Sequence, residues 1–84
     1  MFYVYVLISL HDGGLYIGCT KDLNARINKH NSGLVESTKN RLPLEIVYYE
    51  ACLKQRDALR REKYLKTTYG RRYLKGRLKG YFTG

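Results

Sequence analysis

An Asp-Gly dipeptide between two short alternating apolar segments constrains the fold of this chain more than any other feature. Asp12-Gly13 suits a two-residue hairpin loop, because both central positions of that turn need positive φ. With this pair as the loop, Tyr5 faces Thr20 across the hairpin. Tyr16 then faces Ser9. The sequence thus predicts an antiparallel hairpin at the start of the chain.

The predicted hairpin presents two phenols side by side. Side chains alternate along a strand and directly opposed residues share a face, so Tyr5 and Tyr16 emerge on the same face of the sheet. The opposite face collects five apolar side chains, namely Val4, Val6, Ile8, Leu15 and Ile17.

A helix is predicted over residues 21–30, directly after the hairpin. Thr20 is the expected N-cap, and Asp22 is expected in the first turn, where a negative charge suits the helix dipole. Leu23 and Ile27 are spaced four residues apart, which places both on one buried stripe.

Two polar residues of the same predicted helix, Arg26 and His30, are also four residues apart. They flank the apolar stripe, so both side chains can lean toward the sheet. An alternative is a solvated pair, with His30 helping to end its helix next to Asn31 and Gly33.

A carboxylate stands where an apolar residue is expected in the segment 54–66. Ala58, Leu59 and Leu65 form the stripe predicted to be buried, and Glu62 lies three or four residues from each. An ion on a core-facing stripe is costly unless it is paired or binds a metal. Glu62 is therefore a candidate functional acid.

The coarse pattern predicts an α+β domain, a three-stranded antiparallel sheet flanked by three helices. Gly70 is expected to set off the last helix. The tail that follows is expected either to be frayed or to be docked by Tyr81 and Phe82. The expected strands are residues 2–9, 14–19 and 44–50, and the expected helices are residues 21–31, 54–67 and about 70–80.

These motifs together resemble the GIY-YIG nuclease family, especially its small single-domain members. Tyr3-Val4-Tyr5 takes the place of the GIY tripeptide, and Tyr16-Ile17-Gly18 matches YIG itself. The resemblance covers nearly the whole chain and implies one domain over residues 1–84. It continues through residues 26–30, 37–41, 47–50 and 62–66.

The resemblance implies metal-dependent hydrolysis of DNA phosphodiester bonds. Tyr5 would act as general base, Arg26 would bind the phosphate and Glu62 would bind Mg²⁺ or Mn²⁺, with Tyr16 and His30 in support. The expected substrate is DNA, including branched or damaged DNA, and RNA is a further possible partner.

Each candidate also has a purely structural interpretation. Tyr5 and Tyr16 could be ordinary strand tyrosines, since aromatic residues favour strands. Glu62 could simply pair with Lys66 at i+4, or with Arg26 across the core.

Two positions depart from the family pattern. Tyr3 replaces the first glycine of GIY, and Gly76 stands where many relatives place an asparagine in the last helix. The second departure favours an alternative function: a catalytically weak or inactive module that binds structured DNA or RNA. The presence of all five candidate catalytic residues favours the nuclease.

Positive charge is concentrated at the C-terminal end. The net charge is +9, and residues 54–84 hold 11 of the 16 basic side chains but only 2 of the 7 acidic ones. A polyanionic partner such as nucleic acid fits this distribution, and a solvated basic face is the alternative. The candidate nucleic-acid contacts are Lys29, Lys39, Arg41, Arg71, Arg72, Lys75 and Arg77.

Composition limits the remaining possibilities. A chain of 84 residues has one modest core. Cys19 and Cys52 lack metal-ligand spacing, so buried free thiols are expected, with a single disulfide as the alternative. The longest apolar run, residues 2–8, is far shorter than the roughly 20 residues of a membrane span. A soluble, cytoplasmic protein is therefore expected.

Overall fold

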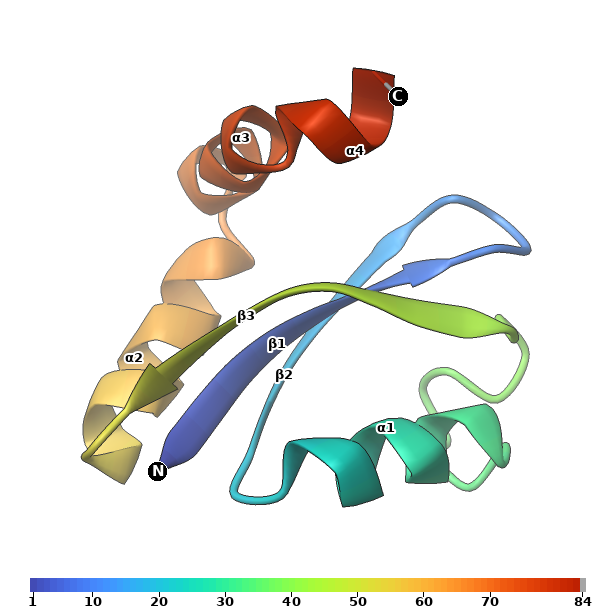
Figure 1. Cartoon of the computed structure of the whole chain (residues 1–84), viewed down its shortest axis with the longest axis horizontal. Coiled ribbons are helices and arrows are strands. Elements are labelled where there is room, and N and C mark those ends of the chain that lie inside the picture. The colour runs from blue at the N-terminus through green and yellow to red at the C-terminus, as the bar shows by residue number, and fades with distance from the viewer. Residues whose placement is uncertain (84) are drawn as a thin grey trace.

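Three antiparallel strands form the sheet, in the order β2-β1-β3, and the structure, a computed structural model, describes residues 1–83 (Figure 1). The predicted α+β class is confirmed. The elements are β1 (Phe2–Ser9), β2 (Leu15–Thr20), α1 (Leu23–Asn31), β3 (Leu44–Cys52), α2 (Gln55–Leu65), α3 (Thr68–Arg77) and α4 (Lys79–Thr83).

The predicted hairpin register is wrong by two residues. Tyr5 faces Gly18 rather than Thr20, and residues 10–13 form the loop in place of Asp12-Gly13 alone. The buried Ser9 hydroxyl explains the longer loop, because it accepts hydrogen bonds from two loop amides, His11 N at 3.2 Å and Asp12 N at 3.1 Å. A shift by an even number of residues leaves every side chain on its face, so the predicted faces are correct.

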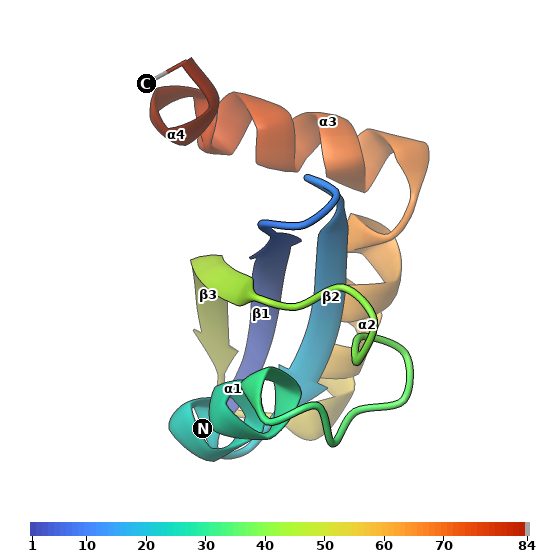
Figure 2. The same ribbon diagram turned by 90° about the vertical axis from the view of Figure 1, so that its right-hand side faces the viewer.

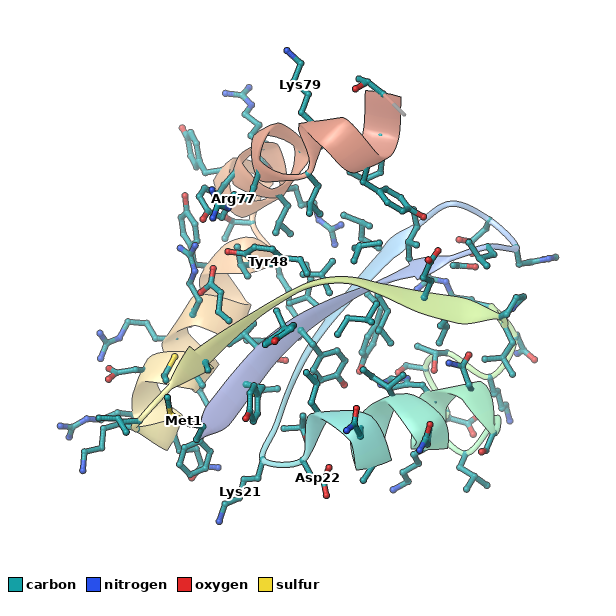
Figure 3. The ribbon with its side chains drawn as sticks, in the orientation of Figure 1. Met1, Lys21, Asp22, Tyr48, Arg77 and Lys79 are labelled. Atoms are coloured by element: carbon teal, nitrogen blue, oxygen red, sulfur yellow. The ribbon has the colours of Figure 1, made fainter. Side chains whose placement is uncertain are left out.

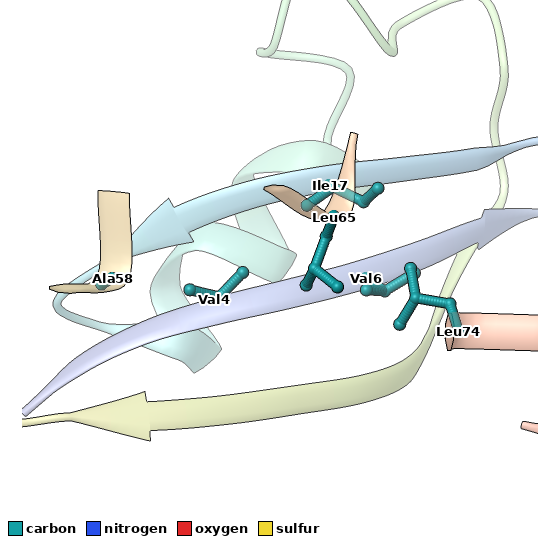
Figure 4. Close-up of a cluster of buried hydrophobic side chains, with 6 residues drawn as sticks. All are labelled: Val4, Val6, Ile17, Ala58, Leu65 and Leu74. Carbon is teal, nitrogen blue, oxygen red and sulfur yellow. The ribbon is translucent and has the colours of Figure 1, made fainter. Parts of the chain in front are cut away.

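Helices cover both faces of the sheet (Figures 1 and 2). On the face of α2 and α3, one buried cluster combines strand and helix side chains, drawn in Figure 4: Val4, Val6, Ile17, Ala58, Leu65 and Leu74. On the face of α1, Leu23 and Ile27 pack against a second buried cluster, as the spacing predicts: Tyr5, Leu7 and Leu44. The central strand β1 therefore contributes to two cores, one on each side.

Leu59 is not part of the core, contrary to the sequence prediction. Its side chain is 48% exposed, whereas Ala58 and Leu65 are fully buried. Ala58, Glu62 and Leu65 lie on the face of α2 that meets the sheet. Leu59 is rotated about 100° around the helix from Ala58, so its side chain points away from the core.

The predicted last helix is divided into α3 and α4. Leu78 ends α3, its side chain is buried, and Tyr81 of α4 donates a hydrogen bond to Glu45 Oε2 at 3.2 Å. Gly70 lies inside α3 rather than before it. A Cβ at Gly70 would collide with the backbone of Tyr64 and Leu65, so the glycine lets α3 approach the end of α2 closely.

Two further expectations concern the cysteines and membrane insertion. Cys19 and Cys52 are both free, and they are partly rather than fully buried. Neither lies at the centre of a cluster, which explains their remaining exposure. Among residues 1–83, no helix has the length and apolar character that crossing a membrane requires.

Candidate active site

The phenol of Tyr5 is the centre of a buried hydrogen-bonded chain between β1 and α1. Arg26 Nε donates to the phenol oxygen at 3.3 Å, and the same oxygen lies 2.8 Å from His30 Nε2. Tyr5 is only 1% exposed. The four-residue spacing of Arg26 and His30 puts both on the helix face toward the sheet, so the prediction that they lean toward it is confirmed.

Thr38, from the loop 32–43, extends this chain by one residue. Its hydroxyl lies 2.8 Å from His30 Nδ1, and both side chains are fully buried. Arg26 can only donate to Tyr5, so the Tyr5 proton is free to point at His30 Nε2. His30 then carries its own proton on Nδ1 and donates it to Thr38, which leaves every group in the chain with a partner.

Local caps hold α1 in the position that this chain needs. Asp22, not Thr20, is the N-cap, and its carboxylate accepts a hydrogen bond from Ala25 N at 3.1 Å. Thr20 instead accepts from Asp22 N at 3.2 Å, which explains the displaced helix start. At the other end, the Asn31 amide bonds both the N–H and the C=O of Leu44, at 2.9 and 3.0 Å.

Gly18 and Tyr16 shape the space around the phenol. A Cβ at Gly18 would collide with the Tyr5 phenol, so only glycine allows the ring to lie across β2. The Tyr16 ring centroid is 6.4 Å from that of Tyr5 and 5.0 Å from that of His30. Tyr5, Tyr16, Arg26 and His30 are thus brought together.

Burial sets the protonation of the two central groups. Burial raises the pKa of the Tyr5 phenol above its usual value, and the hydrogen bond from Arg26 opposes this rise. Burial and the positive charge of Arg26 both lower the pKa of His30. At neutral pH the resting site therefore holds a neutral phenol and a neutral imidazole.

Glu62, on α2, forms no hydrogen bond to this hydrogen-bonded chain. Its side chain is 20% exposed and pairs with Lys66 Nζ at 3.0 Å, which is one of the two pairings that the sequence allowed. Its charge is the smallest of the contributions to the raised pKa of Tyr5, and the carboxylate belongs to α2, which packs on the other face of the sheet from α1. Within residues 1–83, no three His, Cys, Asp or Glu side chains cluster as metal ligands.

The candidate nucleic-acid contacts fall into two separate groups. Lys29, Lys39 and Arg41 lie on α1 and in the loop that follows it, whereas Arg71, Arg72, Lys75 and Arg77 lie on α3, which packs against the opposite face of the sheet (Figure 2). Arg41 is engaged by Asp12 at 3.0 Å, and this hydrogen bond lowers the pKa of the Asp12 carboxyl to about 2. Lys39 pairs with Glu36 at 3.0 Å.

Gly76 lies on α3 in open surroundings. A Cβ built at this position would meet no atom within 4 Å beyond its own helix. The backbone at position 76 is thus open enough to accept a side chain such as the asparagine of the relatives.

Sequence reasoning missed Thr38 and the role of Gly18. Thr38 lies within residues 37–41, which carry part of the family resemblance, but nothing in its spacing relates it to His30. Gly18 faces Tyr5 directly, and the wrong register placed Thr20 there instead.

The buried chain of arginine, tyrosine and histidine on a three-stranded sheet is consistent with the nuclease family that the sequence resembles. Comparison with known families gives the same assignment. Residues 1–77 match the family model described as the GIY-YIG catalytic domain. The chain belongs to the GIY-YIG family, a family of nucleases.

The similar proteins are small members of that family. The chain is 46% identical to a UPF0213 protein of Staphylococcus epidermidis and 44% identical to one of Staphylococcus aureus, each over 77% of this chain and 79% of the relative. The solution NMR structure of a UPF0213 protein from Bacillus halodurans is also similar, with a TM-score of 0.54 and 35% identity. That similarity covers 88% of this chain and 82% of the other.

Proposed function

We propose that this protein is a metal-dependent endonuclease that hydrolyses DNA phosphodiester bonds, with Tyr5 as general base. The observation that carries the proposal is the hydrogen-bonded chain from Arg26 through Tyr5 and His30 to Thr38. A phenol whose pKa is raised cannot serve as a preformed phenolate. It can accept a proton from water only if it passes its own proton on at the same time.

His30 is the group that receives this proton. Its Nε2 lies 2.8 Å from the Tyr5 oxygen, and its lowered pKa keeps the ring neutral and able to accept. The Thr38 hydroxyl, 2.8 Å from Nδ1, can accept the Nδ1 proton in the tautomer that leaves Nε2 free. The relay therefore makes a weak base usable near neutral pH.

Arg26 is suited to binding the scissile phosphate. Its Nε is used on Tyr5, which leaves the other N–H groups of the planar fork for phosphoryl oxygens. The same guanidinium stabilises negative charge that develops on Tyr5 during proton transfer. Arg26 thus positions the scissile phosphate relative to Tyr5, the general base.

Glu62 fits a role in holding Mg²⁺ or Mn²⁺. Such ions prefer oxygen ligands and are commonly bound by one or two carboxylates together with water and substrate phosphate. Glu62 is a partly exposed carboxylate whose one salt-bridge partner among residues 1–83 is the more exposed Lys66 ammonium, and its charge contributes to the raised pKa of Tyr5. A cation bound there would neutralise charge on the phosphate.

Cleavage of plasmid and branched DNA in Mg²⁺, Mn²⁺ or EDTA tests this proposal. Tyr5→Phe and Glu62→Ala should each reduce cleavage roughly 100- to 10,000-fold while DNA affinity is retained, because each removes one positioned catalytic group. Tyr81→Phe is the matched control, since it removes a tyrosine hydroxyl from α4. Wild-type rates for both variants would refute the assignment, and activity in EDTA would remove the metal from it.

The burial of Tyr5 favours a second candidate function. A general base must reach water, and the phenol is only 1% exposed. The second candidate is a catalytically weak module that binds structured DNA or RNA. It predicts that the wild-type protein binds branched DNA or structured RNA but cleaves neither, whichever divalent metal is supplied.

A further inference from the structure

A patch of arginine and tyrosine side chains covers the outer surface of α2 and α3, on the sheet face opposite Tyr5. Arg61 lies over two rings, 5.3 Å from the Tyr64 centroid and 4.7 Å from the Tyr73 centroid. Arg72 lies 5.9 Å from the Tyr69 centroid. We call this group the stacking patch: Arg60, Arg61, Tyr64, Tyr69, Arg72 and Tyr73.

The three tyrosine side chains of the stacking patch are exposed to solvent. Tyr69 is 71% exposed, Tyr64 41% and Tyr73 38%. Exposed aromatic rings beside cations suit single-stranded nucleic acid, because each base has a flat face that can stack on a ring while its phosphates meet the cations. Tyr69 is the most exposed ring of the patch.

A hydrogen-bonded network fixes the base of the patch. Arg61 donates to both carboxylate oxygens of Glu50, the closest contacts being 2.9 Å, and Tyr48 donates to the same carboxylate at 2.6 Å. The Tyr48 and Tyr73 hydroxyls lie 3.3 Å apart. Figure 3 shows Tyr48 reaching from β3 toward α3, which carries Tyr73. The rings that Arg61 contacts are therefore held in place before any partner arrives, which reduces the entropy cost of binding.

The network also compensates the charge of Glu50, an acidic group beside the patch that would otherwise repel phosphate. Glu50 is neutralised by Arg61, and the positive charge of Arg77 further lowers the pKa of its carboxyl. Arg72, in contrast, pairs with no acidic side chain among residues 1–83. The net charge of +9 belongs entirely to residues 54–84, the segment that contains α2 and α3.

A cavity adjoins the stacking patch on the side of α2. Its volume is about 560 Å³, and it is lined by Tyr64, Arg60 and Arg61 together with Glu50, Cys52 and Asp57. This volume is within the range of pockets that hold small ligands. One unpaired base could enter it while its neighbours stack on the exposed rings.

We infer that the stacking patch binds single-stranded DNA, at a surface separate from the Tyr5 site. The inference rests on the proposed function only in that both name DNA. It adds a second surface, which binds an unpaired segment while α1 and Arg26 bind the strand to be cut. Branched and damaged DNA contain such unpaired segments.

Fluorescence anisotropy with labelled oligo-dT of about 12 nucleotides, and with a duplex of the same length, tests the inference. Tyr69→Ala should weaken binding of the single strand about 5- to 150-fold, the loss expected for one stacked base, and leave duplex binding unchanged. Tyr69→Phe should restore binding, because phenylalanine keeps the ring. Phe82→Ala is the matched control, since Phe82 is an exposed ring of α4 outside the patch.

Arg72→Ala supplies a second readout. It should reduce the slope of log affinity against log salt by about 0.7, the value for one phosphate contact on a single strand, whereas Tyr69→Ala should leave the slope unchanged. Wild-type affinity for oligo-dT in both variants would overturn the inference, as would an equal loss in Phe82→Ala.

Failure of this inference can be told apart from failure of the proposed nuclease. Loss of oligo-dT binding in Tyr69→Ala, from a wild-type protein that cuts no DNA, would support the patch and refute the nuclease. Cleavage that depends on Tyr5, with normal oligo-dT binding in Tyr69→Ala, would refute the patch alone.

Discussion

Thr38→Val tests whether the buried hydrogen-bonded chain sets the tautomer of His30. Valine has nearly the shape of threonine but lacks the hydroxyl, so His30 Nδ1–H would lose its acceptor in a fully buried position. A buried donor left without a partner costs about 1–3 kcal/mol of unfolding free energy. For a domain of this size each kcal/mol lowers the melting temperature by about 4–8 °C.

The same variant should also disable the relay. Without Thr38 the imidazole proton can move to Nε2, where it points at Tyr5 and leaves the phenol proton without its acceptor. Cleavage should then fall by at least about 100-fold, the lower range for losing one positioned base.

Urea denaturation and the ¹⁵N chemical shifts of the His30 ring measure the two effects independently. Thr38→Ser is the matched control, because it keeps the hydroxyl and should retain the wild-type tautomer. Thr38→Val with wild-type stability and an unchanged proton on Nδ1 would refute the assigned hydrogen bond. A changed tautomer with an unchanged cleavage rate would refute the relay while leaving the geometry intact.

Three further predictions follow from the same geometry. Gly18→Ala should destabilise the fold by about 1–3 kcal/mol in urea denaturation, because its Cβ collides with the Tyr5 phenol and forces the ring to move; wild-type stability would contradict the close approach. The cleavage rate should fall as the pH falls through the pKa of His30, which lies below the usual 6.5, because a protonated ring cannot accept a proton from Tyr5. A stopped-flow pH profile that is flat down to the acid limit of folding would exclude His30 as the proton acceptor. Gly76→Ala should stabilise α3 by up to about 1 kcal/mol and Gly76→Asn by less, because alanine and asparagine have better helix propensity than glycine and a Cβ there meets no atom within 4 Å. Equal single-turnover rates are expected, and a faster asparagine variant would show that its amide reaches the site.

Local patterns in the sequence sufficed for the sheet faces and for the helix that carries Arg26 and His30. Strand alternation placed Tyr5 and Tyr16 correctly, and it did so even though the register was wrong, because the error was an even number of residues. The register itself depended on Ser9, whose hydroxyl caps the loop, and a buried serine of this kind has no signature in the local pattern.

Contacts between distant segments could not be read from the sequence. Thr38 meets His30 only because the loop 32–43 returns to α1, and such a loop has no periodicity to predict its path. Gly70 carries a close contact between α2 and α3, whereas in the sequence it has the signature of a helix boundary. Secondary-structure propensity depends on the local segment alone. Thr38 and Gly70 are instead determined by contacts with a different element, α1 for Thr38 and the end of α2 for Gly70.

The Asn31 amide has a consequence for how this domain could acquire new specificity. By bonding both backbone groups of Leu44, it joins the two ends of the loop 32–43 through one side chain. A loop whose ends are fixed can lengthen at small entropic cost, since each doubling of length costs only about 0.6 kcal/mol. Residues added to this loop would extend the surface next to Asp12, which Arg41 contacts, while the Asn31 amide keeps the end of α1 beside the start of β3. Because Thr38 of the same loop contacts His30, such insertions are compatible with the buried hydrogen-bonded chain only where they leave residues 32–38 in place.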